Sequence, residues 1–139
     1  MRRLVLASAV FIAASIASAE TNPLVGRWLT TYMDPRGITN YASEITVEPN
    51  GAMSMTTSVS GSGGSGQNTL FYSYQMTGEN SFTARVIDYS PKQMCGVVCL
   101  PVQPIIPIGT TTNCQFSVMN NIELSLSCDG QQATRYSRE

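Results

Sequence analysis

Residues 41–60 read YASEITVEPNGAMSMTTSVS and divide into two segments. In each segment, apolar and polar side chains alternate with the two-residue period of a β-strand. In the first segment, Ile45 and Val47 fall on one face and acidic or hydroxyl side chains on the other, and the second segment alternates in the same way. The intervening residues 49–51, Pro-Asn-Gly, have the chemistry of a tight hairpin turn. The stretch therefore predicts two neighbouring antiparallel strands.

The same two-residue period recurs along most of the chain, and no stretch sustains the 3.6-residue period of a helix. Short turns join the segments, which is typical of a meander, and closing the sheet is the usual way to remove its edges. We therefore expect an all-β fold, an antiparallel up-and-down β-barrel of about eight strands, with a two-sheet β-sandwich as the alternative. The predicted strands are 26–32, 41–48, 52–60, 67–77, 81–89, 114–119, 122–128 and 132–136.

Two segments interrupt the alternation. Residues 61–66 contain only glycine and serine and predict a flexible connection. Residues 90–113 carry four prolines, which exclude a regular ladder and favour extended, polyproline-like chain. Within them, 94–108 is too apolar for a free loop. It could plug one end of the barrel, form a lid over a ligand cavity, or dock a partner protein.

The first nineteen residues have the pattern of a secretory signal peptide. Arg2 and Arg3 precede an apolar run that is too short to span a bilayer, and Ala17-Ser18-Ala19 forms a small-x-small cleavage site. We expect cleavage after Ala19, leaving residues 20–139 as a single domain. The short signal and the absence of a glycosylation sequon favour a bacterial periplasmic or secreted protein with no membrane anchor.

Composition argues against several functions. The chain has no histidine, which removes the usual nucleophile-activating base and the commonest transition-metal ligand. Its formal net charge is −1, and its one lysine is Lys92, so nothing marks a nucleic-acid surface. The carboxylates are scattered, and Asp88 is the one acid that alternation places on an inward face. We expect a protein that is not an enzyme and uses neither metal nor cofactor.

Four cysteines in an exported chain predict two disulfides, which can pair in three ways. A three-residue turn at 120–122 would place Cys114 opposite Cys128 and bring the apolar residues of both strands onto one face. We favour Cys114–Cys128 together with Cys95–Cys99, and the other two pairings remain open. The spacing of Cys95 and Cys99 differs from the Cys-x-x-Cys of redox and zinc sites, so we expect structural disulfides.

Both ends of the mature chain resemble the lipocalin-like barrels of the calycin superfamily. Small bacterial exported barrels share the same general strand pattern. Residues 22–28, NPLVGRW, are similar to the Gly-x-Trp opening of the first strand, and 124–138 look like the closing strands with their terminal arginine. The resemblance implies that Trp28 lies at the closed end of the barrel, covered by Arg135 or Arg138. Such a cation–π contact is structural and contributes about 0.5–2 kcal/mol.

Two functions are compatible with this barrel. It could carry a small apolar molecule inside, because methionine and aromatic side chains suit an irregular apolar pocket. Alternatively, side chains fill the interior, as in many eight-stranded barrels, and the loops bind an exported protein, in the manner of a protease inhibitor. The predicted pocket walls are Met53, Met55, Tyr72, Tyr74 and Phe82, with Ile105 and Ile106 from the apolar segment as part of the lid.

Overall fold

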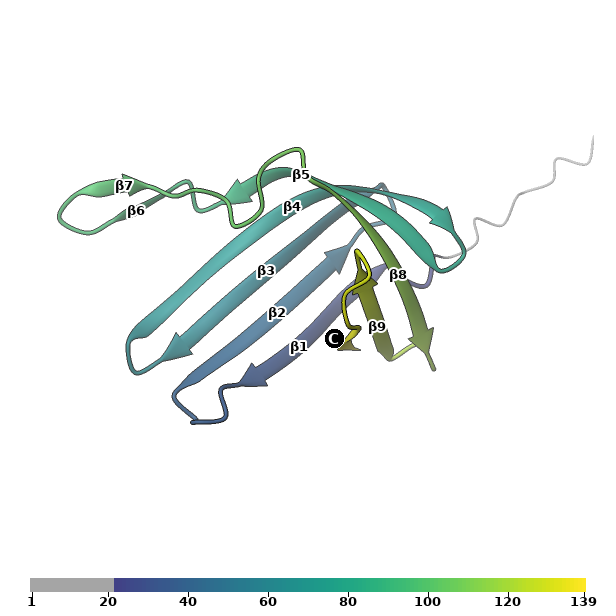
Figure 1. The fold of residues 1–139 in the computed structure, drawn as a ribbon, viewed down its shortest axis with the longest axis horizontal. Helices are drawn as coiled ribbons and strands as arrows, with labels where there is room; N and C mark the ends of the chain where they lie inside the picture. Colours follow the sequence, from purple (N-terminus) through teal and green to yellow (C-terminus); the bar gives the residue numbers. More distant parts are fainter. Residues whose placement is uncertain (1–21) are drawn as a thin grey trace, which may run out of the picture.

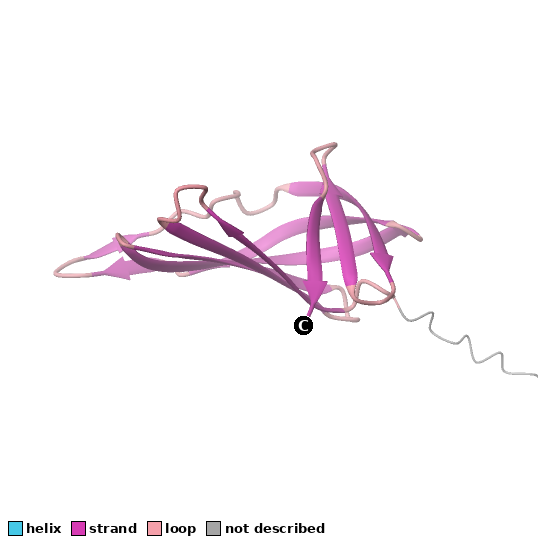
Figure 2. Ribbon diagram, turned by 90° about the horizontal axis from the view of Figure 1, so that it is seen from below, coloured by secondary structure: helices cyan, strands magenta, loops and turns pink. Residues whose placement is uncertain are grey.

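A computed structural model describes residues 22–139 of the chain. The predicted signal peptide, residues 1–19, and its cleavage site lie outside the described residues. Within 22–139, no helix is long and apolar enough to cross a bilayer. The described part is all-β, as predicted, and its strands are shown in Figures 1 and 2.

One antiparallel sheet closes on itself in the order β1-β10-β9-β8-β5-β4-β3-β2, so the barrel prediction is confirmed over the sandwich. A separate two-stranded hairpin, β6-β7, projects beyond the C-terminal end of β5, at the left of Figure 1. The strands are β1 (Gly26–Met33), β2 (Thr39–Val47), β3 (Ala52–Gly61), β4 (Gly64–Gly78), β5 (Ser81–Ser90), β6 (Gln93–Cys95), β7 (Cys99–Pro101), β8 (Thr111–Met119), β9 (Glu123–Cys128) and β10 (Thr134–Arg138).

The barrel closes at one end and flares at the other. Strands β1 and β2 pair along eight residues, whereas only Trp28 and Leu29 of β1 pair with β10. On the opposite side, β5 pairs with β8 only through Ser81–Arg85. The long strands β1–β4 therefore continue past the short strands β8–β10 as an open, curved sheet (Figures 1 and 2).

Trp28 lies at the centre of the closed end, with 0% of its surface exposed. Its indole nitrogen donates a hydrogen bond of 2.9 Å to the Leu24 carbonyl. This satisfies the one polar atom of the side chain, so the ring can be buried without a desolvation penalty. The other largest fully buried side chains are Phe82, Leu24, Leu124 and Val86.

Arg138, and not Arg135, covers Trp28. The Arg138 guanidinium carbon lies 4.1 Å from the ring centroid. Arg138 also donates to the backbone carbonyls of Val25 at 2.9 Å, Asn121 at 2.7 Å and Pro23 at 3.1 Å. Arg135 is 78% exposed and pairs with Glu123 at the surface. Side chains alternate along β10, so Arg135 points outward, whereas Arg138 lies on the same face as Tyr136, which is buried in the barrel.

Gly26 makes room for this arginine. Its φ is 139°, a conformation that side chains rarely adopt, and a Cβ there would lie 2.3 Å from Arg138 Nη1. The glycine of the Gly-x-Trp pattern therefore has a physical role, because any larger residue would push the guanidinium off its carbonyl acceptors.

Both predicted disulfides are present. Cys114 pairs with Cys128 across β8 and β9, in the register that the three-residue turn requires. Cys95 and Cys99 join β6 to β7. The first bridge lies inside the barrel, whereas the second holds a hairpin whose six residues are all exposed.

Two sequence predictions are wrong because strand pairing extends further than composition indicated. The glycine and serine residues 61–66 do not form a flexible connection. Gly61 pairs with Gly64 and Val59 with Gly66, so the strands continue to a two-residue turn at Ser62 and Gly63. The 90–113 segment likewise contains a ladder, the β6-β7 hairpin.

A third prediction fails at Asp88 because of a β-bulge. Phe71 pairs with Asp88 but its neighbour Tyr72 pairs with Val86, which leaves Ile87 as the extra residue on β5. The bulge reverses the alternation after Val86. Asp88 is therefore exposed and forms an ion pair with Lys92, instead of pointing into the barrel.

We predict that Arg138→Gln lowers the free energy of unfolding by about 2–4 kcal/mol, because it removes a cation–π contact and charged hydrogen bonds to three carbonyls. The matched Arg135→Gln should change it by less than about 0.5 kcal/mol, as expected for an exposed ion pair. Urea unfolding of both variants measures the difference. Equal effects would contradict the assignment of Arg138 to the closed end.

We predict that the double variant Cys114→Ser with Cys128→Ser loses about 2–4 kcal/mol of stability, the usual range for a disulfide. Cys95→Ser with Cys99→Ser should leave the barrel's melting temperature almost unchanged, because the β6-β7 hairpin does not belong to the closed sheet. Calorimetry of the two double variants tests this. An unchanged melting temperature in the first variant would refute the prediction.

Candidate ligand cavity

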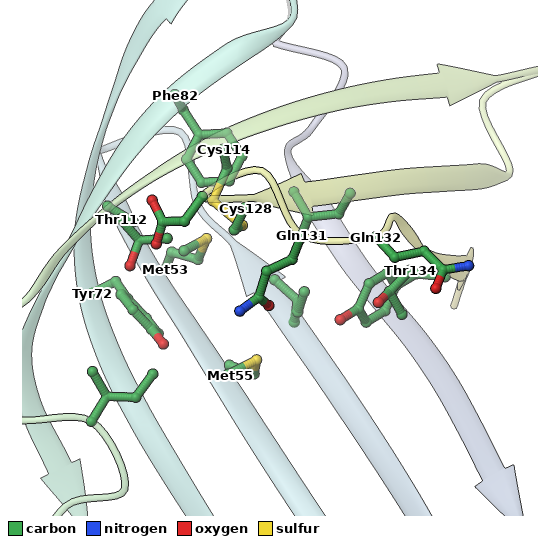
Figure 3. Close-up of a pocket in the computed structure, with 16 residues that line it drawn as sticks. Met53, Met55, Tyr72, Phe82, Thr112, Cys114, Cys128, Gln131, Gln132 and Thr134 are labelled. Atoms are coloured by element: carbon green, nitrogen blue, oxygen red, sulfur yellow. A yellow bond between two sulfur atoms is a disulfide. The ribbon is translucent and has the colours of Figure 1, made fainter.

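A cavity of about 320 Å³ lies inside the barrel, next to the packed closed end. Its volume is at the lower limit of the range for small-molecule sites. Cross-strand pairing builds its floor, because Ile45 pairs with Met55, and Met53 with Tyr72, on the inward face of β2–β4. The lining residues are Ile45, Met53, Met55, Tyr72, Phe82, Ala84, Ile106, Thr112, Cys114, Leu126, Cys128, Asp129, Gln131, Gln132, Thr134 and Tyr136 (Figure 3).

Five of the seven predicted ligand-binding residues line this cavity. Met53, Met55, Tyr72 and Phe82 come from the strands, and Ile106 comes from the apolar segment after β7. Ile106 packs against the core and contributes one wall. The structure thus brings together residues from β3, β4, β5 and the segment that the sequence assigned to a lid.

Tyr74 and Ile105 do not line the cavity. Tyr74 lies on the inward face of β4, one inward-facing position beyond Tyr72 and closer to the closed end. There its hydroxyl donates a hydrogen bond to the Glu48 carbonyl. Its ring packs edge-on against Phe82, with the centroids 6.3 Å apart. Ile105 turns away from its neighbour Ile106 and lines a second groove. Alternation fixes a face and not the depth along it, so it could not separate Tyr74 from Tyr72. Ile105 lies in a segment without alternation, so its direction was not set by the pattern.

The polar side of the cavity was not predicted from the sequence. Asp129, Gln131, Gln132 and Thr134 belong to the β9-β10 connection and the start of β10, and all four are exposed. The cavity therefore meets solvent at this connection. Figure 3 shows the Gln131 side chain extending into the cavity. The available signal was the Asp129-Gly130 turn, which places the following residues over the barrel mouth.

Two tyrosines face each other across the cavity with raised pKa values. Burial raises the pKa of Tyr72 above 10.0, and the neighbouring Tyr136 raises it further. Burial also raises the pKa of Tyr136, against the lowering effect of the nearby Ser43 hydroxyl. Both phenols are thus neutral at physiological pH and able to donate hydrogen bonds.

The second groove lies beneath the apolar segment and measures about 280 Å³. Its walls include Val59, Leu70 and Tyr89 from the flared sheet and Met94 and Ile105 from the segment. Among residues 94–108, Ile106 is the apolar side chain that packs against the barrel core. The tip of the β6-β7 hairpin is exposed, and the exposed apolar side chains there are Met94, Val97, Val98 and Leu100.

The cavity lining offers hydrogen-bonding groups and apolar surface. Within residues 22–139, no three His, Cys, Asp or Glu side chains are grouped as a metal site. The two cavity cysteines are bonded to each other. No family model, curated protein or solved structure matches the chain, so the geometry alone carries the functional argument.

We predict that the barrel loses stability above about pH 10. The raised pKa values of Tyr72 and Tyr136 mean that the folded state keeps protons that the unfolded chain has already lost. Their contribution is therefore constant below the unfolded pKa and is lost as the pH rises through the folded pKa. Urea midpoints of the native chain and of Tyr72→Phe with Tyr136→Phe, measured across this range, should show a shallower decline in the variant. Identical slopes would contradict it.

Proposed function

We propose that this chain is an exported, non-enzymatic binding protein that holds a small apolar molecule inside its barrel. The observation that carries the proposal is the 320 Å³ cavity with a mainly apolar lining beside a fully packed core. A barrel that only needed to be stable would gain by filling this space, because cavities lower stability in proportion to their volume.

The chemistry of the lining supports an apolar ligand. Met53 and Met55 alternate on one face of β3, and flexible thioether side chains adapt to irregular shapes. Phe82 and Tyr72 add flat aromatic surface from β5 and β4. Ile106 covers this surface from a segment outside the closed sheet, so it could move without breaking the barrel.

Export to the periplasm or the medium is part of the same proposal. The pattern of residues 1–19 supports it, as do two disulfides, which persist in oxidising compartments. The position of Arg138 over Trp28 supports the resemblance to lipocalin-like barrels, many of which hold ligands inside.

A second candidate function is protein binding through the β6-β7 hairpin. The observation that favours it is the exposed apolar tip, in which Val98 and Leu100 are 68% and 64% exposed and Val97 is fully exposed. Patches of this kind mark interaction sites in soluble proteins. The two functions use different residues and can be tested separately.

We predict that the neutral fluorescent probe N-phenyl-1-naphthylamine binds the purified protein inside the cavity. Leu126→Trp, which fills the cavity, should weaken binding by at least about tenfold, corresponding to about 1.4 kcal/mol. The same substitution at exposed Leu100 should leave binding unchanged. Fluorescence titration measures all three proteins.

Thr134→Trp provides a second blocking variant, because Thr134 lies at the exposed mouth of the cavity and outside the packed core. It should also reduce probe binding, even if Leu126→Trp disturbs the fold. Probe binding that is lost in Leu100→Trp but kept in both cavity variants would overturn the proposal in favour of the hairpin.

A further inference from the structure

Two buried phenols converge on the cavity from opposite sides of the barrel. Tyr72 belongs to β4 and Tyr136 to β10, and they are 6% and 8% exposed. Both line the cavity. Burial raises the pKa of Tyr72, and the neighbouring Tyr136 adds to this effect. Two neutral hydrogen-bonding groups therefore share a space whose floor is apolar.

The Tyr72 hydroxyl has no acceptor of its own in the described protein. One strand position away, Tyr74 donates to the Glu48 carbonyl, and Tyr72 has no comparable bond. No side-chain polar atom in residues 22–139 is sealed away without a partner, so this hydroxyl opens onto the cavity. Figure 3 shows it directed into the space between Tyr72 and Met55. A donor that opens onto the cavity can bond to water or to a ligand that occupies the cavity.

The charges around the cavity select the kind of partner. No lysine or arginine lines it, so a bound anion would be buried without compensation. The one charged lining residue, Asp129, lies at the exposed mouth, where its Oδ1 accepts a hydrogen bond of 3.0 Å from the Asn113 backbone. The donors that face the interior include the neutral phenols of Tyr72 and Tyr136. Without a cation beside them, a neutral oxygen acceptor costs less to bury here than an anion.

We propose that the cavity binds uncharged molecules that combine an apolar, aromatic-sized body with a carbonyl oxygen, and that Tyr72 and Tyr136 donate to this oxygen. The body occupies the space between Met53, Met55 and Phe82. This inference rests on the proposed function and names its ligand class. It gives Tyr72 the main role, because the hydroxyl of Tyr136 also has Ser43 beside it.

Benzophenone and 1,1-diphenylethylene test the proposal, because they have nearly the same shape and only the ketone accepts a hydrogen bond. The native protein should bind benzophenone about five- to tenfold more tightly than the alkene, as expected for one hydrogen bond to a buried donor. Calorimetric or competition titration against N-phenyl-1-naphthylamine provides the measurement.

Tyr72→Phe removes only the hydroxyl and should reduce benzophenone binding about five- to tenfold, to the level of the alkene. Binding of 1,1-diphenylethylene should stay the same or improve. Tyr136→Phe should have a smaller effect in the same direction, and Tyr74→Phe, whose hydroxyl bonds to Glu48, serves as the matched control with no change in the ratio of the two affinities.

The outcomes separate the two proposals. If both compounds bind equally to the native protein and Tyr72→Phe changes neither affinity, the carbonyl inference is wrong and the apolar cavity stands. If neither compound binds and N-phenyl-1-naphthylamine does not bind either, the proposed function itself fails. A preference for the ketone that survives in Tyr72→Phe would assign the donor to another residue and overturn the role of Tyr72.

Discussion

The barrel depends on the contact between its first and last strands. Only two residue pairs join β1 to β10, fewer than join any other pair of neighbours in the sheet. Arg138 reinforces this seam by lying over Trp28 and donating to carbonyls on both sides of it. Because these acceptors belong to the segment before β1 and to the β8-β9 turn, one side chain adds contacts that the short β1-β10 ladder does not provide. Position 26 is a glycine for a related reason, because a Cβ there would collide with the Arg138 guanidinium.

Closure at one end determines where ligand can bind. Packing is complete around Trp28, Phe82 and Leu124, and it becomes incomplete where β8–β10 end while β1–β4 continue. The cavity lies at this transition, with an apolar floor from the long strands and a polar mouth from the β9-β10 connection. The same difference in strand length therefore produces both the rigid core and the space beside it.

Alternation in the sequence was enough to predict which faces point inward, and hence the fold, the β8-β9 register and most of the cavity floor. It could not predict depth, so Tyr74 and Tyr72 looked equivalent although one bonds to Glu48 and the other faces the cavity. Alternation also failed where one extra residue interrupts the strand, because the bulge at Ile87 turned Asp88 outward. The polar mouth was not predicted because turn residues do not follow the two-residue alternation from which the inward faces were assigned.

The seam between β1 and β10 also has a kinetic meaning. Arg138 and Val25, which it joins by a hydrogen bond, are 113 residues apart in the sequence. Folding slows as the contacts that must form become more distant along the chain, because the entropy of closing a long loop is lost before any contact compensates for it. The hairpins of β2–β5 and β8–β9 form from near neighbours, so the sheet can assemble early as an open ribbon. We therefore expect the sealing of this ribbon into a barrel to be the slow, final event of folding.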